Sequence, residues 1–227
     1  YRIMYSLAGT TFAPYKSVQE INKLLTSVNR LKSEVFDRIK QKFQQLLSQQ
    51  EIPPQEDTQQ HNELRDGACE LLDSDQSAKS TLIDWFISKL LYEMNEIFQV
   101  DDEAGSLENL ARRYIYFKRV LNNFHSNLEQ FFLPSWDLPM HLTETFMETT
   151  RKDLNILLKR EFQDKSPTID LFMNALQETL EFENYINVRF SKKLKDKPKL
   201  STFFQPYLSV WVSHQDKLMD KKLLSYM

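Results

Sequence analysis

The sequence predicts an all-α protein, an elongated antiparallel bundle or rod of about six or seven helices. Three observations support this fold class. The chain has 3 glycines in 227 residues, whereas the tight turns of a sheet-rich protein usually need glycine or asparagine at positive φ. Apolar residues recur at steps of three and four over long segments, which is the period of an amphipathic helix. Prolines with serine or aspartate separate these segments, where helices end and begin.

Composition indicates a polar but folded chain. Charged residues make up 27%, hydrophobic residues 41% and aromatic residues 12%, which is enough apolar bulk for a core. The net charge of −3 and the pI of about 5.9 argue against a dedicated nucleic-acid-binding domain, because such domains are usually strongly basic. The apolar runs are shorter than the ~20 residues of a membrane-spanning helix. Because the chain begins at Tyr1, we interpret it as a fragment.

The first expected helix is long, from about residue 15 to 52, between Pro14 and the pair Pro53-Pro54. Its apolar positions share one helical face: Val18, Ile21, Leu25, Val28, Leu31, Val35, Ile39, Phe43 and Leu46. The polar loop "EIPPQEDTQQ" follows. A short helix is expected in "HNELRDGACELLDSD", weakened by Gly67. The next helix is expected over about residues 77–100, with Trp85 at the edge of a broad apolar face.

The helix that follows has the most regular pattern. Gly105 in "DDEAGS" suits a chain reversal, and Ser106 is a candidate N-cap. The apolar residues then step by three and four as an a/d seam over about three and a half heptads. These residues are Leu107, Leu110, Tyr114, Phe117, Leu121, Phe124, Leu128 and Phe131. The helix is expected to end near Phe132, before Pro134.

The basic residues of "ARRYIYFKR" occupy the flanks of this seam. Arg112 and Arg119 fall at position f, Arg113 at g and Lys118 at e, so we expect all four to line the solvated flank of a packed helix. Arg112 and Arg119 also form an exposed stripe with Tyr116. A single aromatic residue is too few for the base stacking that single-stranded nucleic acids require. The pattern therefore favours a structural helix over a polyanion-binding surface.

Three more helices are expected. One follows Asp137 and Pro139 and carries Leu142, Phe146, Leu154, Leu157, Leu158 and Phe162; a second follows the cap Ser166-Pro167 and carries Ile169, Phe172, Met173, Leu176, Leu180, Tyr185, Ile186 and Phe190. The last begins after Pro206. "YLSVWV" alternates like a strand, but we favour helix because a lone strand has nothing to pair with.

The pattern divides the whole chain into four expected segments. They are 1–56, the long N-terminal helix; 57–191, the bundle core; 192–202, a charged linker; and 203–227, the start of another helical segment.

Residue types that commonly bind metals are scattered. The four histidines, His61, His125, His141 and His214, lie far apart, and no glutamate stands three residues before any of them. Both a helical metal pair and a ferritin-like site are therefore excluded. Cys69 is the single cysteine. It can form neither an intrachain disulfide nor a cysteine-based zinc site, and we expect a buried small hydrophobe.

Catalytic signatures are also missing from the sequence. It contains no GxSxG, P-loop or GxGxxG motif, and 3 glycines leave little room for a phosphate-binding loop. Acidic clusters occur at Asp101-Asp102-Glu103 and at Glu178, Glu181 and Glu183, and we expect them to be solvated. We therefore predict no catalytic, metal or cofactor site, and no enzyme.

The densest basic run lies in the expected linker. It contains Lys192, Lys193, Lys195, Lys197 and Lys199. We interpret it as a charged linker. The alternative is attraction to anionic lipid, at ~1 kcal/mol per charge near a membrane.

Several short motifs, in order, resemble the middle region of the vacuolar protein sorting-associated protein 53 family. They are "ARRYIYFKRVL", "FFLPSWDL", "TRKDLNILLKR", "LEFENYINVRF" and "FFQPYLSVWVSHQDK". The resemblance spans about residues 67–217 and rests on Arg112, Arg113, Tyr114, Lys118, Arg119, Pro134, Trp136, Thr150, Arg151, Phe182, Glu183, Arg189, Phe190, Phe204, Pro206, Gln215, Asp216 and Lys217. Together with Phe117 of the seam, these are the candidate motif and packing residues.

The resemblance implies a subunit of the Golgi-associated retrograde protein (GARP) tethering complex. It implies a non-catalytic helical scaffold that captures endosome-derived vesicles at the trans-Golgi network before SNARE-mediated fusion. Sister subunits, SNARE proteins and small GTPases of the Golgi are the implied partners, and the membrane contact is peripheral. The family usually carries a long acidic insertion before the Phe-x-Pro motif, whereas only residues 192–202 stand there in this chain.

Two other function classes stay open at this point. A spectrin-like cytoskeletal spacer would show repeats of fixed period, and none is found. An enzyme would need titratable groups that converge in a cleft. If the Leu107–Phe131 seam is buried within the chain, partner contacts lie elsewhere, and the long helix from Val18 to Leu47 is the candidate.

Overall fold

The computed structural model describes residues 2–15, 17–48, 61–164, 168–190 and 198–224. These residues form helices and turns without a strand, which confirms the all-α fold class. Within these ranges, no helix is both long and apolar enough to cross a membrane. The chain divides into two compact units. Unit 1 contains Tyr1–Phe86 and His125–Leu138, and unit 2 contains Ile87–Phe124 and Pro139–Met227.

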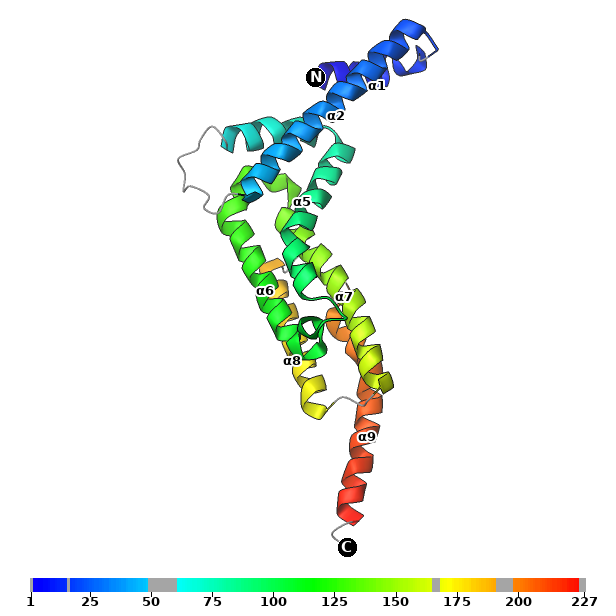
Figure 1. Cartoon of the computed structure of the whole chain (residues 1–227), viewed down its shortest axis with the longest axis vertical. Coiled ribbons are helices and arrows are strands. Elements are labelled where there is room, and N and C mark those ends of the chain that lie inside the picture. The colour runs from blue at the N-terminus through cyan, green and yellow to red at the C-terminus, as the bar shows by residue number, and fades with distance from the viewer. Residues whose placement is uncertain (1, 16, 49–60, 165–167, 191–197, 225–227) are drawn as a thin grey trace. The chain divides into compact units, whose positions relative to one another are not determined.

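Unit 1 begins with a helix that the sequence pattern did not indicate. The helix α1 (Arg2–Thr10) is followed by a 3₁₀ turn η1 (Ala13–Tyr15) and by α2 (Gln19–Ser48). Figure 1 shows α1 beside the N-terminal part of α2, where Ala8 is buried. The long helix thus begins about four residues later than expected, because η1 turns the chain at Pro14. The expected loop "EIPPQEDTQQ" lies outside the described residues.

The expected apolar face of α2 is buried unevenly. Val28, Ile39, Phe43 and Leu46 are buried, whereas Val18 and Leu31 are 42% and 51% exposed. The C-terminal half of α2 therefore supplies most of its packing within unit 1.

The core of unit 1 is a group of aromatic rings from distant parts of the chain. Phe43 of α2 stacks on Phe132 with ring centroids 4.8 Å apart, and Phe86 packs edge-on against Phe132 at 4.8 Å. The remaining elements of this unit are η2 (Asn62–Cys69, π-helical), α4 (Glu70–Asp73), the first half of α5 (Gln76–Ile97), the 3₁₀ turns η6 (Glu129–Phe131) and η7 (Pro134–Trp136), and most of the π-helical η5 (Phe124–Leu128). The helix expected around Gly67 is present, and Gly67 lies inside the π-helical turn.

A close backbone approach explains Gly105. It ends the 3₁₀ turn η3 (Glu103–Gly105), and a Cβ atom there would lie 1.8 Å from the carbonyl oxygen of Gln99. The predicted chain reversal is confirmed, although its cause is space rather than positive φ. Ser106 precedes a second 3₁₀ turn, η4 (Leu107–Asn109), and its side chain makes no capping hydrogen bond. The helix α6 (Leu110–Asn123) starts only afterwards.

The predicted heptad seam is confirmed. All eight seam residues from Leu107 to Phe131 are between 0% and 5% exposed. The segment changes helix type along the way, from α6 to π-helical η5 and 3₁₀ η6. Each of these types keeps residues three to five apart on one face, so the seam stays buried through the changes.

The rest of unit 2 contains the expected helices. They are α7 (Leu138–Asp164), α8 (Ile169–Phe190), the 3₁₀ segment η8 (Leu200–Phe204) and α9 (Gln205–Leu224). The expected cap Ser166-Pro167 lies outside the described residues. At the start of α8, the Thr168 hydroxyl accepts a hydrogen bond from the Leu171 N–H at 3.3 Å. "YLSVWV" is helical, as predicted. On α8, however, Met173 and Leu180 are exposed although the sequence placed them on the apolar face.

An aromatic junction joins α6, α7 and α8, which run side by side in Figure 1. Phe117 stacks on Phe146 with centroids 3.9 Å apart, and Tyr114 stacks on Phe182 at 4.4 Å. Phe146 and Phe182 meet edge-on at 5.4 Å. All four side chains are at most 1% exposed. These rings form the core of unit 2.

Phe117→Asp should unfold unit 2, because it places a charge in a fully buried stack and costs several kcal/mol, roughly 3–5. Arg112→Ala, on the exposed side of the same helix, should change the free energy of unfolding by no more than about 0.5 kcal/mol. Chemical denaturation followed by circular dichroism measures both. Equal losses of stability would contradict the seam assignment.

Candidate functional site

Several candidate motif residues of unit 2 lie around the aromatic junction. Arg113 is 3% exposed and its Nη2 lies 2.5 Å from Oδ2 of Asp153 on α7. Its Nε and Nη1 atoms have no hydrogen-bond partner among the described residues. This overturns the prediction that Arg113 lies on the solvated flank. The g position of α6 faces α7, which supplies the carboxylate.

Tyr114 combines stacking with a buried hydrogen bond. Its hydroxyl lies 3.0 Å from Oγ1 of Thr179, which in turn donates to the Ala175 carbonyl oxygen at 2.7 Å. Burial raises the pKa of Tyr114 well above its ordinary value, and the Thr179 hydrogen bond opposes the shift. The phenol therefore stays neutral, and its hydrogen bond to Thr179 connects α6 to α8.

Glu183 corrects the expectation that the acidic residues of α8 are solvated. It is 7% exposed, and its two carboxylate oxygens accept hydrogen bonds from the backbone N–H and the hydroxyl of Ser201, both at 2.9 Å. Nearby in the sequence, the Pro198 carbonyl oxygen accepts a hydrogen bond from Arg151 Nη2 at 2.9 Å. Residues 198–201 are thus held by α7 and α8. The glutamate is a structural anchor for the segment that leads into α9.

Of the other three basic residues predicted to lie on the solvated flank of α6, Arg112 and Arg119 are on the surface as predicted, whereas Lys118 is not. Arg112 and Arg119 are exposed. Lys118 is half-buried, with its Nζ 4.9 Å from the Tyr185 ring centroid. Arg189 donates to Asn122 Oδ1 at 2.8 Å and to the Tyr185 hydroxyl at 2.9 Å. These contacts connect α6 and α8 along their exposed edge and leave Arg112 and Arg119 facing solvent.

Tyr116 is less exposed than the predicted Arg112–Tyr116–Arg119 stripe requires. It is half-buried, and its ring packs edge-on against Phe98 at 5.9 Å. Burial raises its pKa, and the hydrogen bond to Glu93 acts in the same direction.

The remaining motif residues do not join one site. Trp136 belongs to unit 1, is 1% exposed and donates through Nε1 to Asp73 Oδ1 at 2.9 Å. Phe204 is buried against Phe172 with centroids 5.6 Å apart. Phe190 is half-buried, Pro206 and Asp216 are exposed, and the side chain of Gln215 lies outside the described residues. The candidate motif residues are therefore spread over both units and do not form one site.

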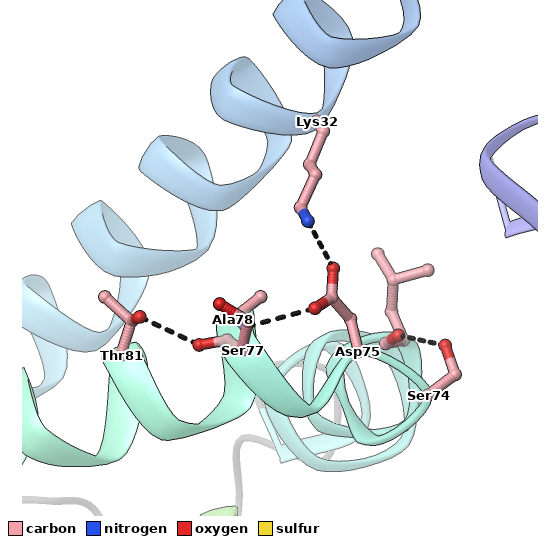
Figure 2. Close-up of polar contacts among 7 residues, drawn as sticks. Lys32, Ser74, Asp75, Ser77, Ala78 and Thr81 are labelled. Carbon is pink, nitrogen blue, oxygen red and sulfur yellow. Dashed lines mark hydrogen bonds and ion pairs between the residues drawn. The ribbon is translucent and has the colours of Figure 1, made fainter. Parts of the chain in front are cut away.

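Sequence reasoning missed an ion pair in unit 1. Figure 2 shows Lys32 reaching from α2 toward Asp75, which precedes α5. Lys32 Nζ lies 2.6 Å from Asp75 Oδ2, and Oδ1 accepts the Ala78 N–H at 3.1 Å. An aspartate immediately before a helix is an N-cap signal that the sequence did carry. Its partner, 43 positions earlier in the chain, gave no signal.

This ion pair forms part of the lining of a cavity of about 710 Å³. Its wall comes from α1, η1, the middle of α2 and the α4–α5 junction. The apolar lining includes Leu25, Val35 and Leu72, and the polar lining includes Thr10, Asn29 and Ser74. The volume lies in the range of roughly 300–1,000 Å³ of protein binding pockets. The cavity is a candidate binding site without a cluster of catalytic groups.

Cys69 is buried in unit 1, as predicted. Burial raises the pKa of its thiol to about 12, so it stays protonated at neutral pH. Among the described residues, no three His, Cys, Asp or Glu side chains are grouped closely enough to hold a metal ion.

We expect Asp153→Ala to lower the free energy of unfolding by about 3–5 kcal/mol, because it leaves a buried guanidinium without its carboxylate. Arg113→Met should cost clearly less, since the Asp153 side chain is 20% exposed and can be hydrated. Urea denaturation of the two variants makes the comparison. If Arg113→Met lowered the free energy of unfolding as much as Asp153→Ala does, the cost would not come from leaving the buried guanidinium unpaired.

Because of the Lys32–Asp75 pair, the free energy of unfolding should depend on pH in the acid range. Burial alone would raise the pKa of Asp75, but the Lys32 ammonium and the N–H groups of Ala78 and Ser77 outweigh it and hold the pKa below the usual 3.8. The stabilisation is then complete above the unfolded-state pKa and is lost as the pH falls through the lower folded-state value.

The stability difference between wild type and Asp75→Asn should therefore shrink as the pH is lowered from 7 to about 3. Thermal unfolding at a series of pH values measures it. Asp102→Asn, at an exposed turn residue, is the control. A difference that stays constant over this range argues against the pair.

Comparison with known proteins identifies the family. A family model described as "Vps53, N-terminal" matches residues 1–227. Vacuolar protein sorting-associated protein 53 of Saccharomyces cerevisiae is 60% identical over 227 residues, which is 100% of this chain and 27% of the yeast protein. Protein 53 A of Arabidopsis thaliana is 27% identical over 180 residues (79% of this chain, 21% of the relative). The Caenorhabditis elegans homolog is 28% identical over 150 residues (65% and 18%).

No solved structure matches the chain. The chain spans 27% or less of the length of these relatives. The matching model is the N-terminal one of the family, which corrects the expectation of a middle region. With a match along the whole chain and a relative of 60% identity, the chain belongs to the Vps53 family and represents its N-terminal region.

Proposed function

We propose that the chain is part of a non-catalytic scaffold subunit of a multisubunit vesicle-tethering complex of the GARP type. In this role the complex captures endosome-derived transport vesicles at the trans-Golgi network before SNARE-mediated fusion. The match of the family model to residues 1–227 carries the proposal. The relatives' names connect them with vacuolar protein sorting, which agrees with a role in retrograde membrane traffic.

The way the structure uses its titratable groups supports a non-catalytic role. Arg113 is engaged by Asp153, Tyr114 by Thr179 and Glu183 by Ser201. Each of these groups joins two elements of the fold, and none of them lines the 710 Å³ cavity of unit 1. An active site needs several such groups converging on one reacting atom. Their distribution suits a scaffold whose polar interactions specify helix packing.

Sister subunits are the first partners that we propose, with SNARE proteins and small GTPases of the Golgi as further partners. Exposed apolar side chains on α1, α2 and α9 support docking by helix packing. On α9 these include Val212, Met219 and Leu223, which are 49%, 64% and 61% exposed. We also propose a peripheral location on the cytosolic face of trans-Golgi network and endosome membranes.

The full-length protein, tagged and purified from cells under native conditions, should copurify with the sister subunits of a tethering complex in near-stoichiometric amounts. Quantitative mass spectrometry makes the measurement, and an untagged strain is the control. Depletion of the protein should also prevent endosome-derived cargo from returning to the Golgi. A purified protein without tether subunits, together with normal cargo return, would defeat the proposal.

A further inference from the structure

A buried guanidinium in unit 2 has hydrogen-bond donors that the protein does not use. Arg113 is buried, and its Nη2 lies 2.5 Å from Oδ2 of Asp153. Its Nε and Nη1 are also buried, and neither has a hydrogen-bond partner among the residues that the structure describes. Such donors are rare in folded proteins, because an unmade hydrogen bond leaves the desolvation of a charged group uncompensated. An acceptor is therefore expected beside Arg113.

Thr150 on α7 carries a buried hydroxyl that is also unused. The side chain is fully buried, and its Oγ1 has no hydrogen-bond partner within the described ranges. The other two buried threonines behave differently: Thr143 donates to the Pro139 carbonyl oxygen at 2.8 Å, and Thr179 donates to the Ala175 carbonyl oxygen at 2.7 Å. These are the ordinary bonds of a helical threonine to the preceding turn. The Thr150 hydroxyl does not make this bond, so it is available to a partner outside its own helix.

The register of α7 places this hydroxyl beside the guanidinium. Phe146, Thr150 and Asp153 follow one another at steps of four and three, hence on one helix face. Arg113 contacts both ends of that face, because its Cζ lies 5.9 Å from the Phe146 ring centroid and its Nη2 pairs with Asp153. The guanidinium therefore passes over the position of Thr150. Two open donors and one open hydroxyl are enclosed in the same part of the core.

We propose that an internal water molecule occupies this place and joins α6 to α7. The water accepts a hydrogen bond from Nε or Nη1 of Arg113 and donates one to Oγ1 of Thr150. Buried waters in proteins make about two to four hydrogen bonds, to polar groups that the chain itself leaves unpaired. The site adds to the tethering proposal without depending on it.

Other occupants suit this place less well. An anion is disfavoured because Asp153 already neutralises the Arg113 guanidinium, so a further negative charge would be buried without compensation. Arg151 cannot easily supply that compensation. It follows Thr150 at about 100° around the helix, hence on another face, and its Nη2 donates to the Pro198 carbonyl oxygen at 2.9 Å. A side chain of another protein cannot reach nitrogen atoms that are buried.

A structure of the full-length protein, alone or in its complex, tests the site directly at a resolution where ordered water is visible. We expect a density peak at ~2.7–3.2 Å from Oγ1 of Thr150 and from Nε or Nη1 of Arg113. Crystals grown in bromide instead of chloride are the control for an anion, because bromide scatters anomalously and water does not. A bromide signal, a direct contact between the two side chains, or the lack of any peak would overturn the proposal.

Hydrogen exchange in the full-length protein tests whether the water stabilises the contact between α6 and α7. Thr150→Val replaces the hydroxyl with a methyl group and leaves the water without its acceptor. The amides of residues 114–118 in α6 should then exchange at least about tenfold faster, because local opening becomes easier. Thr143→Val, equally buried on the same helix, is the matched control. It should change the rate by less than about threefold, because its hydroxyl bonds only within its own helix. Thr150→Ser keeps the hydroxyl and should exchange like the wild type.

Arg113 and Thr150 should also act as one unit. In an Arg113→Met background, Thr150→Val should cause no further acceleration, because the guanidinium that holds the water is gone. The proposal fails if Thr150→Val disturbs exchange no more than Thr143→Val, or if its full effect adds to that of Arg113→Met. These outcomes do not involve copurification with tether subunits, so the failure of this site and the failure of the proposed function are distinguishable.

Discussion

The stacking of Phe117 on Phe146, with centroids 3.9 Å apart, is the contact on which unit 2 depends. It joins α6 to α7, and Phe182 of α8 meets both rings at 6.0 and 5.4 Å. Large aromatic rings bury much apolar area and pack with specific geometry. Once these rings meet, the polar contacts around them have little freedom, so Arg113 can reach Asp153 and Tyr114 can reach Thr179.

The buried polar groups around this junction give a structural reason for several of the distinctive residues in the short motifs. Arg113, Tyr114 and Glu183 each form a hydrogen bond or ion pair with one residue on another element. Buried ion pairs add little net stability, because desolvation offsets their attraction, but a buried charge without its partner is costly. Such groups therefore discriminate against wrong helix pairings. In the proposed scaffold role this discrimination would have a direct use, because it keeps the surfaces of different helices in fixed positions.

Part of the structure could be predicted from local pattern. The all-α class, the burial of the seam from Leu107 to Phe131, the buried Cys69 and the helical "YLSVWV" segment all follow from periodicity and composition. The same reasoning placed Arg113 in solvent and overlooked α1 and the Lys32–Asp75 pair. Arg113 and the Lys32–Asp75 pair concern contacts between residues far apart in sequence, because a heptad position gives the face of a helix but not the neighbour that covers that face. The short helix α1 was a miss of another kind, since its segment carried no recognised periodic pattern.

The sequence by itself determined most of the long helices and the apolar side of each, because helix period and capping are local properties of the chain. It also carried the family resemblance. Tertiary structure decided which helix faces are buried by a neighbouring element. Asp153 on α7 pairs with Arg113, and Ser201 on η8 binds Glu183. On α2, in contrast, α1 and the α4–α5 junction leave a cavity. Burial and pairing depend on what lies across a contact, and only the folded chain brings those residues together.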